Sequence, residues 1–263
     1  MSIFKLKMSQ CLAIPLLVIF LILIESNAGC CEEKANDFIE LIKIAKLFQI
    51  EIITYNHAFP IKTTHGPING KNADKKSLEP YVLIFAQEFS LYNPDIIKKM
   101  QLKRVVFCVD LSFDGQLRGA VPDFEHNTLY LDIACGAYLK LYQREVIHHE
   151  LFHIIDWRDD GNLYKDEVWS ALNPKSFAYG TGGKNAQNPD SGVLTDKYPG
   201  FLNHYSTTGV EEDKAEVFAK MMLEQAYLKE RIKKDKVLSE KVERMKALTI
   251  SFCSAMPSAT AVF

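Results

Sequence analysis

Residues 149–153 read HELFH, with histidines at His149 and His153 and a glutamate at Glu150. Apolar residues around this stretch recur at helical intervals, which predicts a helix over 141–156. Side chains four residues apart share one face of a helix, so both imidazoles can reach one metal ion. The glutamate beside the first histidine can then take a proton from a water molecule held by that ion. The stretch therefore predicts a zinc (Zn2+) site with His149 and His153 as ligands and Glu150 as the catalytic base.

A catalytic zinc ion usually has three protein ligands, and two possibilities for the third are open. In the first, Asp159 closes the site, because it follows His153 at the short spacing that one class of zinc peptidases uses. That arrangement needs a glycine three residues after the second histidine to turn the chain back, and this chain has Asp156 there. We expect Asp156 to orient a ligand histidine or to cap the helix instead.

In the second possibility, a glutamate on a later helix, expected over 210–228, closes the site. Glu212 and Glu216 lie four residues apart on this helix, so they share one face. Acidic residues in a first turn also suit the positive end of a helix dipole, but this does not explain Glu216 one turn further along. The later helix therefore offers a carboxylate as the third ligand.

Tyr205 stands seven residues before Glu212. With the HELFH stretch and Glu216, this spacing resembles the gluzincin pattern of peptidases of the anthrax lethal factor type and of a broader group of zinc-binding metallopeptidases. The resemblance covers residues 128–225. It implies that Glu212 is the third ligand, that Tyr205 stabilises the oxyanion, and that Glu216 supports the ligands from behind. It also implies an α+β, zincin-like fold: a small mixed sheet with an active-site helix and a second ligand-bearing helix.

The first 28 residues have the form of an export signal. Two lysines precede an uncharged run over 11–24, and small residues lead to Ala28, as in signals that are removed on secretion. Two alternatives stay open: an uncleaved membrane anchor, or a lipid on Cys30, because Ala28-Gly29-Cys30 resembles the end of a bacterial lipobox. We expect an exported protein, secreted, periplasmic or at the cell surface, that contacts a membrane only through such a lipid anchor.

The composition is that of a globular protein. Of the 263 residues, 48% are hydrophobic and 24% are charged, and the formal net charge is -2. This charge gives no basic field, which argues against a nucleic-acid partner. We expect residues 29–263 to form one zincin-like metallopeptidase domain, with an N-terminal part over 32–127 and a catalytic part over 128–250. The oligomeric state is not predicted.

The cysteines bear on the expected export. Removal of the signal leaves an odd number of cysteines, which in an oxidising compartment implies a free or modified thiol. No two of them have the Cys-x-x-Cys spacing of a zinc cluster. The pairing among Cys31, Cys108, Cys135 and Cys253 is open.

The expected function is that of a zinc-dependent metallopeptidase acting on a peptide or protein substrate. A strand expected over 128–133 is either an edge strand that pairs with extended substrate or a plain core strand. The Gly/Pro/Asn-rich segment over 173–203 is long for a loop in a compact domain, which is typical of functional loops. Two other functions stay open: a binding lipoprotein on a peptidase scaffold without turnover, and a zinc hydrolase of a non-peptide bond.

Overall fold

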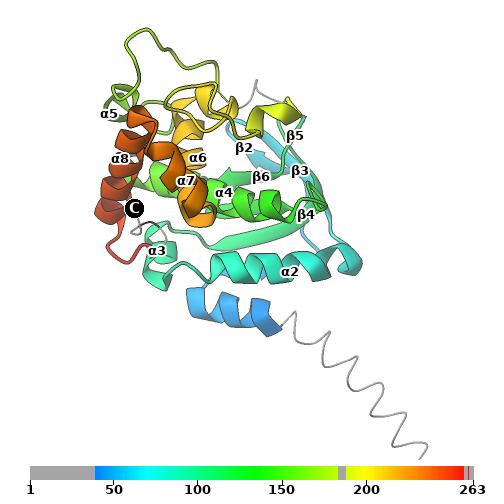
Figure 1. Ribbon diagram of the computed structural model, residues 1–263. Coiled ribbons are helices and arrows are strands. Elements are labelled where there is room, and N and C mark those ends of the chain that lie inside the picture. The colour runs from blue at the N-terminus through cyan, green and yellow to red at the C-terminus, as the bar shows by residue number, and fades with distance from the viewer. Residues whose placement is uncertain (1–38, 183–187, 258–259, 261–263) are drawn as a thin grey trace, which may run out of the picture.

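The computed structural model describes residues 39–182, 188–257 and 260. The expected export signal, Cys30 and Cys31 lie outside these residues. Within them, helices flank a mixed sheet, and α4 runs across the middle of the molecule (Figure 1). None of the described helices is long and apolar enough to cross a membrane.

The sheet has seven strands, and its main path runs β2-β3-β4-β7-β6. β4 is central, because its first half pairs with β1 and β7 and its second half pairs with β3 and β5. The β1–β4 and β4–β7 pairs are parallel and the others antiparallel. The strands are β1 (Glu51–Ile53), β2 (Ile61–Thr63), β3 (Gly66–Asn72), β4 (Arg104–Phe113), β5 (Gln116–Leu117), β6 (Ala120–Asp123) and β7 (Thr128–Asp132).

The helices lie before, between and after these strands. A first helix covers residues 39–48. It is followed by α2 (Lys75–Phe89), α3 (Pro94–Lys99), α4 (Lys140–Asp160), α5 (Glu167–Ser170), α6 (Val210–Leu223), α7 (Gln225–Ile232) and α8 (Lys236–Phe252). Two short 3-10 turns, η2 (Pro189–Gly192) and η3 (Tyr205–Thr207), lie in the segment between α5 and α6.

β4 divides the interior into two parts. Its apolar, β-branched run predicts a strand, and successive side chains point to opposite faces of the sheet. Val105 and Phe107 point into the main core, to which α2, α4, α6 and α8 also contribute, whereas Val106 and Cys108 join a smaller cluster. Burying a side chain of this size contributes about 1.5–3 kcal/mol. The main core therefore fixes α4 against the sheet.

α4 is packed on two sides. Its residues Ile147 and Leu151 lie in the main core, as the helical pattern predicts. Phe152 packs against Phe218 of α6, with ring centroids 5.1 Å apart. α4 is also longer than the expected helix over 141–156, because the chain continues in helical form until Gly161. That glycine has φ 76°, a left-handed conformation that ends many helices.

Two further expectations about elements can be compared with the structure. The strand expected over 128–133 is β7, and of the two alternatives it is the core strand, because β7 lies between β4 and β6. The edge strand next to β7 is β6, which contains Pro122 and lies in a stretch whose glycines and proline predict turns. The helix expected over 210–228 is two helices, α6 and α7, which separate at Glu224, where φ is -127°.

Candidate metal centre

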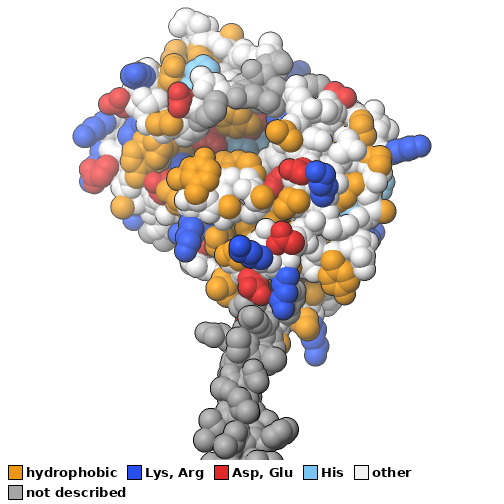
Figure 2. Space-filling model, turned by 90° about the vertical axis from the view of Figure 1, so that its right-hand side faces the viewer, with side chains coloured by type: hydrophobic (Ala, Val, Ile, Leu, Met, Phe, Trp, Pro, Cys, Tyr) orange, Lys and Arg blue, Asp and Glu red, His pale blue; other side chains and the backbone are white. Residues whose placement is uncertain are grey.

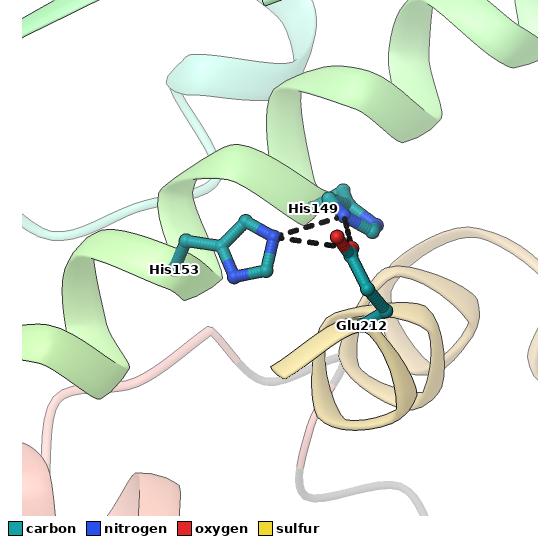
Figure 3. Close-up of side chains that lie close together, drawn as sticks. All are labelled: His149, His153 and Glu212. Atoms are coloured by element: carbon teal, nitrogen blue, oxygen red, sulfur yellow. Dashed lines mark hydrogen bonds and ion pairs between the residues drawn. The ribbon is translucent and has the colours of Figure 1, made fainter. Parts of the chain in front are cut away.

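The three ligands expected from the sequence come together in the structure. α4 carries His149 and His153, and α6 carries Glu212 in its first turn. His153 Nε2 lies 3.0 Å from His149 Nε2 and 3.5 Å from Glu212 Oε2. His149 Nε2 lies 3.1 Å from the same oxygen. Figure 3 shows the three side chains pointing toward one another from the two helices.

This set of atoms fits a metal ion. One potential ligand atom from each residue lies within 4.8 Å of the other two, and all three residues are buried. The Nε2 atoms of His149 and His153 face each other at 3.0 Å. If neither nitrogen carried a proton, their lone pairs would repel, so a cation or a proton has to lie between them. Two imidazoles and one glutamate form the ligand set of one type of catalytic zinc site. The chemistry of the three residues is therefore that of a divalent cation site.

The same atoms form a buried ion pair. Burial alone would raise the pKa of Glu212, but hydrogen bonds from His149 and His153 outweigh burial and hold that pKa well below its usual range. Burial alone would lower the pKa of His149, but Glu212 and Glu216 outweigh it and raise that pKa well above its usual value. The Glu212 carboxylate is therefore ionised at neutral pH and presents a full negative charge to a cation.

Glu216 lies behind His149. Its Oε1 is 3.1 Å from His149 Nδ1, and its Oε2 accepts a hydrogen bond from Asn203 Nδ2 at 2.6 Å. A carboxylate in this position fixes the orientation of the imidazole and the nitrogen that faces the metal. The sequence places Glu216 near the site but does not identify Asn203. Asn203 is fully buried, and it does not belong to any sequence motif with a fixed spacing to the ligands.

Asn203 also shapes the turn that carries Tyr205. Its Oδ1 accepts a hydrogen bond from Ser206 N at 2.8 Å, and Ser206 Oγ donates to the Asn203 carbonyl at 2.9 Å. The Tyr205 ring centroid lies 6.0 Å from that of His149. Burial, and then the Glu212 carboxylate, raise the pKa of Tyr205 well above its usual value. The hydroxyl therefore keeps its proton at neutral pH and can donate it in a hydrogen bond.

The two aspartates near the end of α4 do not join the site. Asp159 is exposed, because α4 continues past it instead of turning back toward His153. Asp156 is buried, but it neither caps the helix nor bonds to a histidine. It pairs with Lys214 Nζ of α6 at 2.7 Å. The expected role for Asp156 is therefore wrong: its partner is a cation on the neighbouring helix, and the pair ties α4 to α6.

A second buried carboxylate, that of Asp213, holds α6 in position. Asp213 follows Glu212 and is fully buried. Its Oδ2 accepts hydrogen bonds from Trp169 Nε1 at 2.8 Å and from the Tyr179 hydroxyl at 2.6 Å, and lies 2.7 Å from Lys241 Nζ of α8. These contacts connect α6 to α5, to the segment after it and to α8. They set the position of Glu212, and the sequence alone does not indicate them.

α4 is also anchored by α2. His148 stands beside His149 in the chain and is fully buried, with its partners in and just after α2. Its Nε2 lies 2.9 Å from Glu88 Oε2, and its Nδ1 lies 2.8 Å from the Tyr92 hydroxyl. Glu88 also accepts a hydrogen bond from Arg144 Nε. Both helices that carry the candidate ligands are thus held by buried polar contacts behind the site.

A cleft with a volume of about 2240 Å³ opens onto the site. His149, Glu150, His153, Tyr205 and Glu212 are among the residues that line it. Figure 2 shows this hollow, with histidine and acidic side chains inside it and hydrophobic side chains around it. Sites for small molecules typically occupy about 300–1,000 Å³. The cleft is therefore large enough for a segment of polypeptide.

Comparison with known proteins identifies the fold. Neither a comparison with family models nor one with curated proteins gives a match. Among solved structures, the chain is similar to a "putative zinc-binding metallo-peptidase" from Bacteroides caccae, with a TM-score of 0.56 and 16% sequence identity over 87% of this chain and 90% of that one. The chain therefore shares the mixed α+β fold of that protein, which agrees with the fold that the resemblance implies.

Proposed function

We propose that the protein is a zinc-dependent metallopeptidase of the gluzincin type. The observation that carries the proposal is the convergence of His149, His153 and Glu212 at a large cleft. The metallopeptidase fold agrees with this chemistry. In this proposal the three residues hold zinc, and Glu216 and Asn203 hold His149 in place. The resemblance to the lethal factor type stays a prediction from the residues.

The roles of the residues follow from their places at the cleft. Zinc, when bound, supplies a Lewis acid toward water and the scissile carbonyl. Glu150 follows His149 on α4 and lines the cleft, where its carboxylate accepts the proton of the attacking water and passes it to the leaving amine. Tyr205 keeps its proton at neutral pH and donates a hydrogen bond to the oxyanion that develops on the substrate.

β6 offers a place for the substrate backbone. In the described sheet it is one of the edge strands, and it borders the cleft. The Gly119 carbonyl accepts from Asp132 N at 2.8 Å, and Val121 is paired with Tyr130 of β7. In this antiparallel register, the N–H and C=O of Ala120 point to the unpaired side. An extended peptide would add to β6 through Ala120, because Pro122, the next outward residue, has no N–H.

The test is hydrolysis by the purified full chain. We expect the zinc-loaded protein to cleave peptide bonds in a mixture of unfolded proteins, read by mass spectrometry of new termini. A chelator should abolish cleavage, and added zinc should restore it. Binding of the same peptides without new termini would show a binding module that does not turn over. Hydrolysis of ester or amide probes without cleavage of any peptide would show a hydrolase of another bond.

A further inference from the structure

The first helix, over residues 39–48, has apolar side chains on two faces. Its inner face packs into the main core through Leu41, Ile44 and Phe48. The Phe48 ring meets that of Phe89 in α2, with ring centroids 5.0 Å apart. Figure 1 shows this helix beside α2, at the edge of the molecule. The inner face therefore explains where the helix lies, but it leaves the opposite face open.

The opposite face is also apolar. Ile39 is 40% exposed, Ile42 65% and Leu47 58%. Because successive helical residues are about 100° apart, these three side chains lie within an arc of about 140°. A single exposed apolar residue is common, but a surface helix normally presents polar residues outward. Three large apolar side chains on one arc of a short helix therefore indicate a surface that binds a partner.

Two lysines lie within the same arc. Lys46 is exposed, and the Lys43 side chain is 64% exposed, with its Nζ 2.6 Å from Glu40 one turn earlier. An apolar surface of another protein would remove water from these ammonium groups, which is unfavourable. A membrane surface suits them, because apolar side chains enter the headgroup boundary while the lysine stems reach up to lipid phosphates. The mixture of residues on this arc therefore favours an anionic lipid surface as the partner.

The place of the helix in the chain agrees with this partner. Ile39 stands nine residues after Cys30, the position at which the sequence offers a lipid anchor. A fully extended chain of that length reaches at most about 30 Å. An uncleaved anchor over 11–24 would also hold the helix close to the membrane. A chain that is tethered in this way needs only a weak second contact, because the tether makes that contact intramolecular.

We propose that this face of the first helix docks on the surface of the membrane that anchors the chain. We call it the outer face; its residues are Ile39, Ile42, Lys43, Lys46 and Leu47. The lipids that it fits have anionic headgroups. This contact goes beyond a tether at Cys30, and it depends neither on the metal centre nor on the proposed peptidase function. α2 separates the helix from α4 (Figure 1), so docking would leave the cleft open to solvent.

The experiment places a tryptophan in the outer face of the full chain. Ile42→Trp protein is reconstituted into vesicles of equal parts phosphatidylglycerol and phosphatidylcholine with brominated acyl chains, and flotation checks that the protein is bound. Bromine should quench the new tryptophan, and its emission should shift to shorter wavelength, because the side chain enters the lipid. Ile250→Trp on α8 is the matched control: Ile250 is 60% exposed and should stay unquenched. Wild-type protein gives the background of the two native tryptophans.

A charge reversal tests the choice of anionic lipid. Lys43→Glu, made in the Ile42→Trp protein, should lower the ratio of docked to undocked protein by about fivefold or more, as estimated from the quenching. Lys233→Glu is the control, since Lys233 is 66% exposed and pairs with Glu230 at the same i,i+3 spacing. Melting temperatures of all variants check that the fold is intact.

Each other outcome contradicts the proposal. If wild-type protein does not float with the vesicles, or if Ile42→Trp is bound but unquenched, the outer face does not contact lipid. An unquenched Ile42→Trp with blue-shifted emission would show a different cover: a second copy if sedimentation finds a dimer, and another part of the same chain if it finds a monomer. Equal quenching with Lys43→Glu and Lys233→Glu would show that anionic headgroups are not recognised.

Discussion

Glu150 is the side chain whose removal separates metal binding from chemistry. It lines the cleft beside His149 but does not belong to the group of residues that could hold the ion. Glu150→Gln should keep bound zinc and lower peptide hydrolysis by about 10²-fold or more, because an amide cannot accept the proton of water. Zinc content and kcat would be measured together, with Glu240→Gln on α8 as the control. Loss of zinc in Glu150→Gln would show that this residue serves the metal or the fold.

Tyr205 tests whether the site stabilises an oxyanion. Tyr205→Phe should retain zinc and thermal stability, leave KM nearly unchanged and lower kcat by about 10²–10³, the usual loss for one oxyanion donor. Tyr55→Phe is a suitable control, because Tyr55 is 68% exposed and does not border the cleft. A variant that melts at a lower temperature but keeps its specific activity would identify Tyr205 as a packing residue.

At the scale of residues, the sequence predicts what depends on local spacing. His149 and His153 share a helix face, so their convergence could be predicted from spacing. Glu212 is 63 residues from His149, and only the family resemblance implies it as the third ligand. Asn203 and the Asp156–Lys214 pair could not be predicted. Their partners are 13 and 58 residues away, and a lone Asn or Asp in a sequence does not indicate which distant side chain it will meet.

The helices that carry the candidate ligands depend on buried ion pairs. Lys241 of α8 and Asp213 of α6 have fully buried side chains 2.7 Å apart. Lys241→Met should lower the free energy of unfolding by about 3–5 kcal/mol, because it leaves a buried carboxylate without its cation. Denaturant unfolding would measure the loss. Lys236→Met on the same helix is the control, since that side chain is 89% exposed and should change stability little. An equal effect of both changes would contradict this role for Lys241.

At the scale of elements, the sequence predicts the helices and most of the sheet but misses the edge. The periodic apolar residues of α4 and the β-branched run of β4 are strong local signals. β6 is short and contains Pro122, which argues against a strand in a single sequence. β6 forms because the backbone groups that point toward β7 pair with that strand. Pro122 lies at a position whose backbone points away from β7, so its missing N–H costs no hydrogen bond. The extra turn of α4 depends on where Gly161 turns the chain.

At the scale of the whole molecule, the ion should add to stability. A ligand that binds only the folded chain stabilises it by about 2.7 kcal/mol at 100 times its Kd. For a chain of this size that raises Tm by about 5–10 °C, measured by thermal unfolding with and without a chelator. His153→Ala should remove most of this response, because one ligand is lost. If zinc raised Tm equally in wild type and in His153→Ala, the stabilising ion would be bound somewhere else.

The central claim is that α4 and α6 together hold one zinc ion, and its most direct test is anomalous diffraction at the zinc edge from crystals of the zinc-loaded protein. We expect a single strong peak at the cleft in each chain, about 2.0–2.2 Å from the ligand atoms of His149, His153 and Glu212. Glu150 should lie next to the peak without binding it. A zinc-loaded crystal with no peak between these three side chains, or with a peak held by other residues while Glu212 points away, would contradict the claim.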